Sequence, residues 1–552
     1  MPDATPAAAV ELARALKVSE TFAHWLVTRG LADVDAARRF LAPRLSELSS
    51  PASMLDRSLA AERLARAVKN GEHVAVFGDY DCDGITATAV LTELLRALGG
   101  QVTPLVARRF EGGYGVSSPA VQRILETGAR LLVTCDCGSS DHASLRVLAE
   151  QGVEVIVIDH HLVPDEPLPA LAFLNPHRPG CGFAFKGLAS CGLALSVGAA
   201  VRAELGRTVD LKAVLDLVAI GTIADVAPLV ADNRALVRAG LALLSEARRP
   251  GLRALFELAG IERNAPLTAE DVAFRIAPRL NAPGRLGSPA LALELLLERN
   301  EARADALAGE LEQSNLARKS AQDAILKEAL EEIERLGYAE RPALVLGREG
   351  WGQGLVGIVA GRLADRFGRP ALVLGFENGL GRGSVRGPAG SRLYDALSEV
   401  GPLLERFGGH QAAAGLEMRV ERLDEVRAAF ERAVAAQGRP AAAGAEAPCV
   451  SLRAGDTTSR VLADFALLEP CGEGNPCPEL ELAATVVRAR EVTGGHLKLE
   501  LELAGGERLG GFGPGLGGRA GALSGQLVVR GRLRRDRYRG GDAAELLVLA
   551  LT

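Results

Sequence analysis

The sequence predicts a multidomain α/β protein whose first large folded unit is a doubly wound parallel sheet. Short runs rich in Val, Ile and Leu, such as residues 74–77 and 153–158, do not alternate apolar and polar side chains, as expected for strands covered on both faces. Helical patterns lie between these runs, at residues 85–98 and 118–126. At 552 residues the chain exceeds what one hydrophobic core normally supports, so about three domains are expected.

The remainder of the chain divides by composition. Residues 301–336 contain no proline and a single internal glycine, Gly309, which predicts one long charged helix. A second α/β pattern comes next, with strands at 343–346 and 371–374 and helices at 356–366 and 392–407. Residues after 449 alternate apolar and polar side chains between glycine-rich turns, which indicates a five-stranded barrel of the oligonucleotide-binding (OB) type.

The expected organisation has six parts. These are an N-terminal helical cap on the neighbouring domain (1–50), a catalytic domain (51–297), a connecting long helix (298–337), a smaller α/β domain (338–436), a linker rich in Ala, Gly and Pro (437–448) and an OB-like DNA-binding domain (449–552).

Acidic residues and histidines come directly after four apolar segments of the first unit, each of which we interpret as a strand. Segment 74–77 is followed by Asp79, Asp81 and Asp83, segment 131–134 by Asp136, segment 153–158 by Asp159, His160 and His161, and segment 215–223 by Asp225. A single aspartate before a glycine is commonly a turn residue. Because the carboxyl ends of parallel strands meet at one edge, where ligands bind, we expect these side chains to converge into a site.

The chemistry of this group favours divalent metal. Oxygen ligands with one or two imidazoles suit Mn²⁺ or Mg²⁺. Six candidate ligands are too many for one ion that also keeps water, so we expect two ions. We expect Asp79, Asp81 and Asp136 on one ion, and Asp83, His160, Asp225 and the shared Asp136 on the other. Two ions about 3.5–4 Å apart activate a bridging water and clamp an in-line phosphoryl displacement, so a phosphate ester or anhydride is the expected substrate.

Two further residues complete the expected catalytic group, which consists of Asp136, Asp159 and His161. Asp159 is expected to orient an imidazole from outside the ligand set. His161 is then available for a substrate phosphate or the leaving oxygen.

Composition excludes several other classes of protein. No window approaches the about 20 uncharged apolar residues of a membrane span, and residues 1–17 lack the pattern of a signal peptide, so we expect a cytoplasmic protein without membrane contact. The eight cysteines form no Cys-x-x-Cys pair, so neither a disulfide framework nor a closed four-ligand zinc site is indicated. The net charge of −6 does not by itself indicate nucleic-acid binding, although an arginine-rich segment lies at 530–539.

The motifs, in order, resemble those of the DHH phosphoesterase superfamily. The four stretches concerned are residues 78–84, 136–138, 159–161 and 221–225. Residues 408–415 resemble the substrate-binding motif of the associated DHHA1 domain, which here is the smaller α/β domain. Residues 109–115, 278–285 and 469–476 are similar to stretches of the superfamily's bacterial single-strand-specific exonucleases. Many relatives have a histidine ligand four residues before Asp81, where this chain has Phe77, so the resemblance implies that Asp79 replaces it.

The resemblance implies an activity that spacing alone does not. It implies a 5′-to-3′ exonuclease for single-stranded DNA that prefers Mn²⁺, with Mg²⁺ as the second candidate, and that acts on the nucleoid in recombination and repair. Single-stranded DNA is the implied partner, with a single-stranded-DNA-binding protein, a helicase and other repair proteins as further candidates. The alternatives are an inactive DNA-binding or replication scaffold protein, a phosphodiesterase for short oligonucleotides or cyclic dinucleotides, and a pyrophosphatase. The full ligand set argues against the first, and the barrel and chain length favour a polymeric substrate.

Candidate DNA contacts lie in four regions. An arginine is more often a surface or ion-paired residue than a functional one, so each candidate competes with that reading. The candidates are Arg109 and Tyr114, then Arg279, Asn281 and Arg285 in a segment interpreted as a turn, then Ser384, Arg386 and His410, and finally Arg532, Arg534, Arg535 and Arg537 near the C-terminus.

Overall fold

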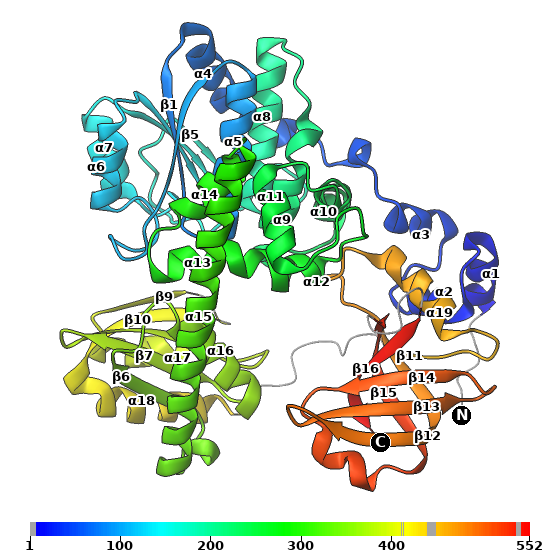
Figure 1. Cartoon of the computed structure of the whole chain (residues 1–552). Coiled ribbons are helices and arrows are strands. Elements are labelled where there is room, and N and C mark those ends of the chain that lie inside the picture. The colour runs from blue at the N-terminus through cyan, green and yellow to red at the C-terminus, as the bar shows by residue number, and fades with distance from the viewer. Residues whose placement is uncertain (1–6, 410, 412, 439–448, 537–542, 552) are drawn as a thin grey trace.

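The computed structural model describes residues 7–409, 411, 413–438, 449–536 and 543–551 (Figure 1). A parallel-sheet domain lies at the top of the view, a smaller α/β domain lies below it along a long helix, and a barrel of strands lies at the lower right. The predicted multidomain α/β architecture is confirmed. Within these residues, no helix is both long and apolar enough to cross a membrane.

The first sheet domain, residues 57–297, is built on five parallel strands in the order β2-β1-β3-β4-β5. The strands are β1 (His73–Gly78), β2 (Gln101–Val106), β3 (Leu131–Cys135), β4 (Glu154–Ile158) and β5 (Ala172–Leu174). One face is covered by α4 (Arg57–Asn70), α5 (Cys82–Ala97) and α8 (Ser190–Leu205), and the other by α6 (Ser118–Glu126) and α7 (His142–Glu150). The doubly wound sheet is thus confirmed. Strand order reverses between β1 and β3, where ligands bind in such sheets.

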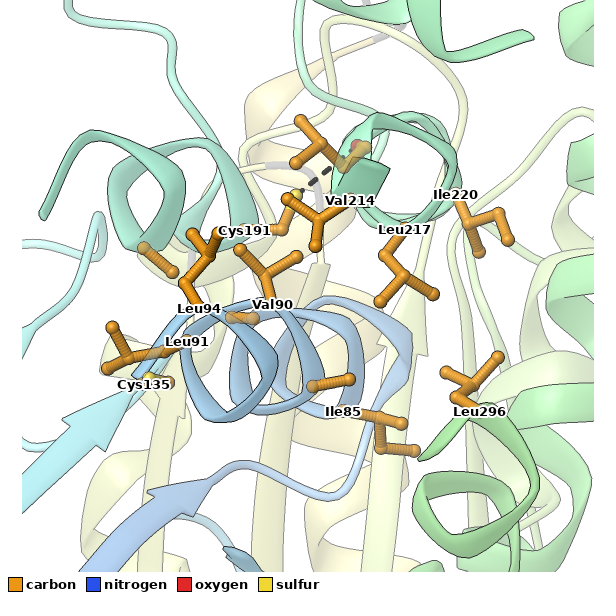
Figure 2. Close-up of a cluster of buried hydrophobic side chains, with 14 of the residues drawn as sticks. Ile85, Val90, Leu91, Leu94, Cys135, Cys191, Val214, Leu217, Ile220 and Leu296 are labelled. Atoms are coloured by element: carbon orange, nitrogen blue, oxygen red, sulfur yellow. Dashed lines mark hydrogen bonds between the residues drawn. The ribbon is translucent and has the colours of Figure 1, made fainter. Parts of the chain in front are cut away.

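The fourth apolar segment is a helix, so its prediction as a strand was wrong. Residues 215–223 lie in α9 (Leu215–Ala224) and are all buried. An unbroken apolar run has the same pattern in a buried helix and in a buried strand, which explains the error. Figure 2 shows Leu217 and Ile220 of α9 packed in the same cluster as Ile85 and Val90 of α5. This contact sets the end of α9 beside the start of α5.

Further helices complete the first sheet domain. They are α10 (Ala231–Ser245), α11 (Pro250–Ala259), α12 (Ala269–Asp271), α13 (Ala277–Leu286) and α14 (Ala290–Leu297). The segment 279–285, predicted as a turn, lies inside α13, so that prediction was wrong. Leu280, Ala282 and Pro283 are buried, and this burial offsets the hydrogen bond that Pro283 cannot donate within the helix.

The predicted long helix is confirmed as α15 (Glu301–Leu336). The side chain of Asn300 caps its start by accepting a hydrogen bond from the backbone N–H of Arg303 at 2.9 Å, and Gly337 ends it with a φ of 65°. Leu307 belongs to the core of the first sheet domain, and Ile333 belongs to a core of the second. The helix therefore joins the two domains by packing on both.

The second sheet domain contains five strands in the order β6-β7-β8-β10-β9. The strands are β6 (Leu344–Glu349), β7 (Ala371–Glu377), β8 (Leu380–Arg386), β9 (Arg406–Gly409) and β10 (Ala413–Arg419), and the helices are α16 (Val356–Phe367), α17 (Leu393–Val400) and α18 (Leu423–Gln437). The helix predicted over 392–407 ends at Val400, because Gly401 and Pro402 interrupt it, and residues 406–409 form an edge strand instead.

The C-terminal strands close into the predicted barrel. The strands are β11 (Cys449–Ser451), β12 (Glu479–Val492), β13 (His496–Leu503), β14 (Arg508–Gly513), β15 (Gly525–Arg535) and β16 (Ala544–Leu551), with α19 (Thr458–Phe465) beside them. Because β12 pairs with both β13 and β15, the five long strands form a closed ring.

The N-terminal helices lie against this barrel. Helices α1 (Ala7–Leu16), α2 (Glu20–Thr28) and α3 (Val34–Leu41) share one hydrophobic core with the C-terminal strands. The rings of Phe22 and Phe465 are 6.0 Å apart, and Asp464 Oδ2 accepts a hydrogen bond from the backbone N–H of Ser19 at 2.7 Å. These helices were predicted as a cap on the domain next to them in the sequence. In the structure they and the barrel form one body, hereafter the barrel module.

Candidate metal centre

The loop after β1 brings three carboxylates to the edge of the first sheet. Asp81 caps α5, because its Oδ1 accepts hydrogen bonds from the backbone N–H groups of Asp83 (3.1 Å) and Gly84 (3.2 Å). A Cβ atom on Gly84 would lie 2.5 Å from the backbone nitrogen of Asp79, so only glycine permits this close turn. Asp79, Asp81 and Asp83 are therefore held together at the strand end.

Asp83 is held by the N-terminus of α8. Its Oδ2 accepts a hydrogen bond from the N–H of Ser190 at 2.7 Å, and its Oδ1 accepts one from the N–H of Cys191 at 2.9 Å. The Ser190 hydroxyl also donates to Oδ1 of Asp136 at 3.0 Å. A helix N-terminus carries partial positive charge, which stabilises a buried carboxylate. Ser190 and Cys191 were not predicted from the sequence, although a serine opening an apolar helical pattern was a usable signal.

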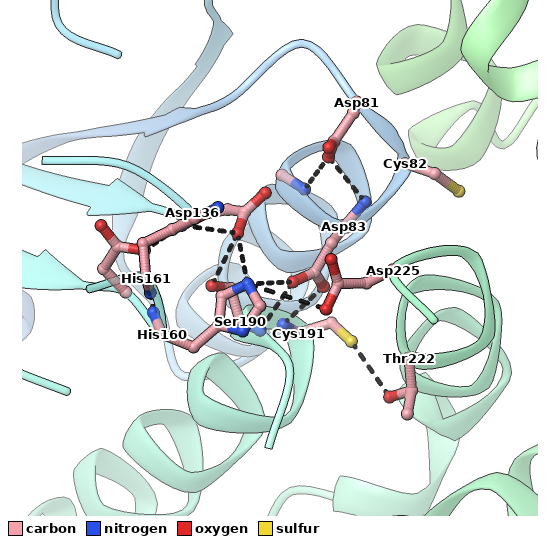
Figure 3. A network of polar contacts seen from close by, with 12 residues as sticks. Asp81, Cys82, Asp83, Asp136, His160, His161, Ser190, Cys191, Thr222 and Asp225 are labelled. Atoms are coloured by element: carbon pink, nitrogen blue, oxygen red, sulfur yellow. Dashed lines mark hydrogen bonds and ion pairs between the residues drawn. The ribbon is translucent and has the colours of Figure 1, made fainter. Parts of the chain in front are cut away.

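His160 and Asp225 approach the carboxylates from two further segments (Figure 3). Nε2 of His160 lies 3.2 Å from Oδ1 of Asp136, 3.7 Å from Oδ2 of Asp225 and 3.9 Å from Oδ2 of Asp83. Asp225 directly follows α9, and Asp136 follows β3 with a left-handed φ of 64°. The structure thus brings together side chains from four separate segments of the chain.

Burial and mutual repulsion disfavour the charged forms of these carboxylates. Burial, together with the charge of Asp81, raises the pKa of Asp79 well above its usual range. Burial and the charges of Asp83 and Asp81 act in the same way on Asp136, whose pKa is also well above its usual range. The same causes raise the pKa of Asp225 to about 8. These groups cannot all be ionised at neutral pH without compensating positive charge.

Two atoms of the cluster point to what supplies that charge. Oδ1 of Asp79 and Nε2 of His160 are buried and have no hydrogen-bond partner among the described residues. Buried polar atoms normally have a partner, and bound cations would provide one for each. Burial lowers the pKa of His160, which keeps its imidazole in the neutral form that binds metal. The residues therefore fit a divalent cation.

The ligand atoms fall into three groups, within each of which they lie no more than 4.8 Å apart. The groups are Asp79 with Asp81 and Asp136, Asp83 with His160 and Asp225, and Asp136 with His160 and His161. The first two groups share no residue. Asp136 and His160, one from each of them, meet in the third, so the two groups adjoin. Carboxylates with imidazole are the ligands that Mn²⁺ and Mg²⁺ accept.

His161 is oriented by Asp159. Nδ1 of His161 lies 2.7 Å from Oδ1 of Asp159, and the N–H of Ser139 donates to Oδ2 of Asp159 at 3.2 Å. Burial alone would raise the pKa of Asp159, but these hydrogen bonds outweigh it and the pKa is lowered. Burial would lower the pKa of His161, but the hydrogen bond and charge of Asp159 outweigh it and raise the pKa to about 9. Without a bound cation, these neighbours therefore favour the protonated form of His161.

Tyr114 reaches the same place from the loop after β2. Its hydroxyl donates to the backbone carbonyl of Asp136 at 3.1 Å and lies 3.1 Å from Nδ1 of His161. Tyr114 as a whole residue is 40% exposed, so it joins the buried cluster to the surface.

Arg109 and Arg285 lie together near the start of α5. The Arg109 guanidinium stacks 4.0 Å from the Tyr80 ring centroid. Arg285 donates to the carbonyl of Gly354, in the loop before α16, at 3.2 Å. Burial, with the nearby charge of Arg109, lowers the pKa of Arg285 to about 10. In the described part of the chain, no carboxylate forms an ion pair with either arginine. Positive charge thus lies between the two sheet domains.

The other two candidates in α13 differ from each other. Arg279 forms a bidentate ion pair with Glu312 of α15, at 2.7 Å through Nε and 3.2 Å through Nη2. Oδ1 of Asn281 is buried and has no hydrogen-bond partner among the described residues. Arg279 therefore already has an acidic partner within the protein, whereas the buried side-chain oxygen of Asn281 has no donor among the described residues.

Ser384 and Arg386 lie on β8 beside the N-terminus of α16. Arg386 donates to the Ser384 hydroxyl at 2.7 Å and to the Val385 carbonyl at 2.8 Å, and burial lowers its pKa. A Cβ atom on Gly357, in the first turn of α16, would lie 3.1 Å from Oγ of Ser384 and 3.5 Å from Nη2 of Arg386. A guanidinium without a carboxylate partner beside a helix N-terminus is suited to phosphate.

The C-terminal arginines are mostly paired. Arg532 contacts Glu479 at 3.0 Å and Arg534 contacts Glu545 at 2.7 Å, whereas Arg535 is exposed at the end of β15. The two remaining candidates, His410 and Arg537, lie outside the described residues.

Two family models match the chain. Residues 73–222 match the DHH family, N-terminal domain, and residues 340–436 match the DHHA1 domain. The fold and site thus define a DHH protein with an appended DHHA1 domain. The first match lies within the first sheet domain, and the second covers the second sheet domain.

Relatives named "Single-stranded-DNA-specific exonuclease RecJ" match most of the chain. The relative from Bacillus subtilis (strain 168) is 36% identical over 482 residues, which are 85% of this chain and 59% of that protein. The relative from Dickeya dadantii (strain 3937) is 37% identical over 472 residues, 81% of each chain. The chain belongs to the RecJ family.

Solved structures agree with this membership. The crystal structure of RecJ from Thermus thermophilus in complex with Mn²⁺ has a TM-score of 0.84 and 34% identity, over 100% of this chain and 78% of that one. The complex with Mg²⁺ has a TM-score of 0.79 and 32% identity, over 100% and 77% of the two chains. The similarity to these two structures therefore extends over all domains of this chain.

Proposed function

We propose that this protein is a 5′-to-3′ exonuclease specific for single-stranded DNA that hydrolyses phosphodiester bonds in recombination and repair. The observation that carries the proposal is the buried group of carboxylates and His160 at the carboxyl edge of the parallel sheet. The RecJ relatives, which are named single-stranded-DNA-specific exonucleases, supply the substrate class. The polarity rests on the motif resemblance alone.

Two divalent cations are proposed at this site, with Mn²⁺ preferred and Mg²⁺ as the second candidate. Asp79, Asp81 and Asp136 would hold one ion, and Asp83, His160, Asp225 and the shared Asp136 would hold the other. The Thermus thermophilus relative has been crystallised with each of these metals. When bound, such ions activate water and stabilise the charge of an in-line phosphoryl displacement.

The residues of the chain itself would orient the substrate and supply a proton. Asp159 keeps Nδ1 of His161 protonated, so the Nε2–H of the cationic ring is the donor left for a phosphate oxygen or the leaving oxygen. Ser190 fixes one oxygen of Asp136, which leaves the other oxygen for a ligand.

The terminal phosphate of the strand is proposed to bind at Ser384 and Arg386, with His410 as a further candidate. The buried guanidinium and the start of α16 offer charge-assisted hydrogen bonds there. Arg109, Arg285 and Asn281 would contact the strand between the two sheet domains, and Tyr114 would stack on a base. For Arg279, the ion pair with Glu312 favours a structural role instead.

The barrel is proposed to hold the strand outside the cleft. Among the described candidates of the barrel, Arg535 is the one without an ion pair, whereas Arg532 and Arg534 could bind phosphates only by breaking their ion pairs with Glu479 and Glu545. A single-stranded-DNA-binding protein or a helicase is the proposed protein partner, on the nucleoid in the cytoplasm. An inactive scaffold is disfavoured because the full set of ligands is retained.

The decisive assay uses DNA labelled at either end, single-stranded or duplex, with Mn²⁺, Mg²⁺ or a chelator. We expect mononucleotides from the 5′ end of single strands only, and none with the chelator. Release from the 3′ end would overturn the polarity, and the absence of product with either metal would overturn the proposal of an enzyme.

Arg386→Ala tests the phosphate site. This substitution should raise KM for 5′-phosphorylated strands by about tenfold to a hundredfold, since a hydrogen bond to a charged group contributes about 1.5–3 kcal/mol. Arg382→Ala, also on β8, is the control, because Arg382 forms an ion pair with Glu417 at 2.6 Å. Equal losses on 5′-hydroxyl strands would remove Arg386 from end recognition.

A further inference from the structure

One helical run of the first sheet domain contacts both other bodies of the protein. Residues 269–286 continue without a break through α12, a short π-helix and α13. At the start of this run, the backbone N–H of Ala269 donates to Oε2 of Glu469, in the loop between α19 and β12, at 3.2 Å. At its other end, Arg285 donates to the carbonyl of Gly354 in the second sheet domain. The run therefore reaches from the barrel module to the junction of the two sheet domains (Figure 1).

One side of this run carries residues that are not buried. Phe274, Pro278, Asn281 and Arg285 follow one another at intervals of four, three and four residues, the spacing that places side chains on one face of a helix. Among the described residues, Arg285 has no carboxylate partner and Oδ1 of Asn281 has no hydrogen-bond donor. The face thus has a positive charge and an amide at the end near the metal centre, and an aromatic ring toward the barrel module.

Phe274 is the most exposed large apolar residue in the described part of the chain, at 74%. An exposed apolar side chain by itself is common on soluble proteins. Phe274, however, lies in the π-helix Val272–Ile276, and π-turns within α-helices occur frequently at functional sites. Val272 and Ile276 pack into the core of the first sheet domain, whereas the ring between them points to solvent. The ring therefore contributes little to the core and is available to a ligand.

We propose that Phe274 stacks on a base of the DNA strand between the metal centre and the barrel module. The inference rests on the proposed function, which makes single-stranded DNA the ligand. Unpaired bases expose their π-faces, and proteins bind them with aromatic side chains while cationic groups hold the phosphates. Arg285 and Asn281 supply polar groups on the same face, so the strand lies along this helix, with a phosphate at Arg285 and a base on Phe274.

The length of the helix sets how long a strand must be to reach Phe274. Phe274 and Arg285 are eleven positions apart, which is about 16 Å at a rise of about 1.5 Å per residue. A dinucleotide held at the metal centre is too short to reach the ring. Glu270, one turn before Phe274, is exposed and acidic, so the phosphate contacts of this face end before it. Phe274 therefore contributes to the binding of long strands.

The first test measures binding of long single strands to the full-length protein by fluorescence anisotropy, with chelator so that the strand stays intact. Phe274→Ala should weaken binding about five- to a hundredfold, the range for loss of one base–aromatic stack. Phe274→Leu should lose nearly as much, because leucine is apolar but has no π-face, and Phe274→Trp should bind at least as well as the wild type. Leu258→Ala, at a 44% exposed site on α11, is the control and should bind like the wild type.

The second test follows hydrolysis with Mn²⁺. Phe274→Ala should raise KM for long single strands by the factor found in binding, and KM for dinucleotides far less. Because the ring is exposed, the melting temperature of each Phe274 variant should stay at the wild-type value, which separates loss of stacking from loss of folding.

Phe274→Trp also reports the contact directly. The two tryptophans of the chain, Trp25 and Trp351, are 0% and 4% exposed, so the new indole would be the exposed emitter. Stacking on a base should quench its emission when a long single strand is added, and a dinucleotide should leave the emission unchanged.

Two results would overturn the proposal. Equal affinity of the wild type and Phe274→Ala for long strands would show that the strand does not contact the ring. Wild-type affinity of Phe274→Leu would show that the contact needs no π-face and is not stacking. Failure of the proposed function would look different, because the wild type itself would then neither bind nor degrade single strands.

Discussion

Replacing Asp225 with asparagine should stabilise the metal-free protein at high pH and remove stabilisation by metal. The pKa of Asp225 lies at about 8 rather than 3.8, because burial and the charges of Asp83 and Asp81 oppose its ionisation. The folded pKa exceeds the unfolded one, so the folded protein holds this proton more tightly. That contribution to stability is complete below the unfolded pKa and is lost as the pH rises through about 8.

The size of the effect can be worked out from the pKa difference. Each pKa unit corresponds to about 1.4 kcal/mol, so ionised Asp225 lowers the free energy of unfolding of the metal-free protein by at most about 6 kcal/mol. The measured gain will be smaller, because Asp83 and Asp136 share the proton of the cluster. Asparagine has the same shape and no charge, so Asp225→Asn removes the repulsion and also a metal ligand.

The assay is thermal unfolding of wild type and Asp225→Asn at about pH 5 and about pH 8.5, with chelator or with Mn²⁺. With chelator, the variant should exceed the wild type by a small margin at the lower pH, which already lies above the unfolded pKa, and by a larger margin at the higher pH. With Mn²⁺ the order should reverse. Asp165→Asn, at an exposed site, is the control. A variant less stable than wild type at both pH values without metal would refute the reasoning, because the carboxylate would then be stabilised by its neighbours.

Three further predictions concern other parts of the chain. Ser190→Ala removes the 3.0 Å hydrogen bond to Asp136 and should weaken Mn²⁺ binding about five- to tenfold in calorimetry, with little change in melting temperature. Arg279→Ala leaves the largely buried Glu312 without its partner and should cost about 3–5 kcal/mol of stability, which Glu312→Gln should partly restore. A loss of DNA binding at unchanged stability would instead assign Arg279 to the substrate. Deletion of residues 449–552 should weaken binding of long single strands more than turnover of short ones, provided that residues 1–41 are deleted too, since they share the barrel core. Equal losses on long and short strands would contradict a role of the barrel in capture.

Local patterns were sufficient to predict the parallel sheet and the strand ends that carry Asp79 and Asp136. Strands buried on both faces leave a strong signal, and parallel topology dictates that their carboxyl ends meet. The type of the segment before Asp225 was not predictable in this way, because a short buried helix and a buried strand have the same apolar pattern. The structure nevertheless brings Asp225 to the other candidate ligands, because the end of α9 lies beside the start of α5.

Contacts between distant segments could not be predicted from the sequence. The N–H groups of Ser190 and Cys191 reach Asp83 across 107 and 108 residues of chain, and no local pattern encodes such a distance. The ion pair that commits Arg279 to Glu312 depends equally on how α13 packs on α15. A basic residue in a functional-looking motif therefore needs its partner to be known before it can be assigned to a ligand.

Arg234 shows how both ends of the chain are tied to the catalytic domain. This buried side chain of α10 donates to the carbonyl of Phe40 at 2.8 Å and to that of Leu468 at 2.7 Å. Burial lowers its pKa to about 10, yet its hydrogen bonds to backbone carbonyls satisfy the guanidinium in place of a carboxylate. Phe40 belongs to the N-terminal helices of the barrel module and Leu468 to its C-terminal part. One residue of the first sheet domain therefore binds both parts. The position of the barrel is therefore set by the domain that carries the metal centre.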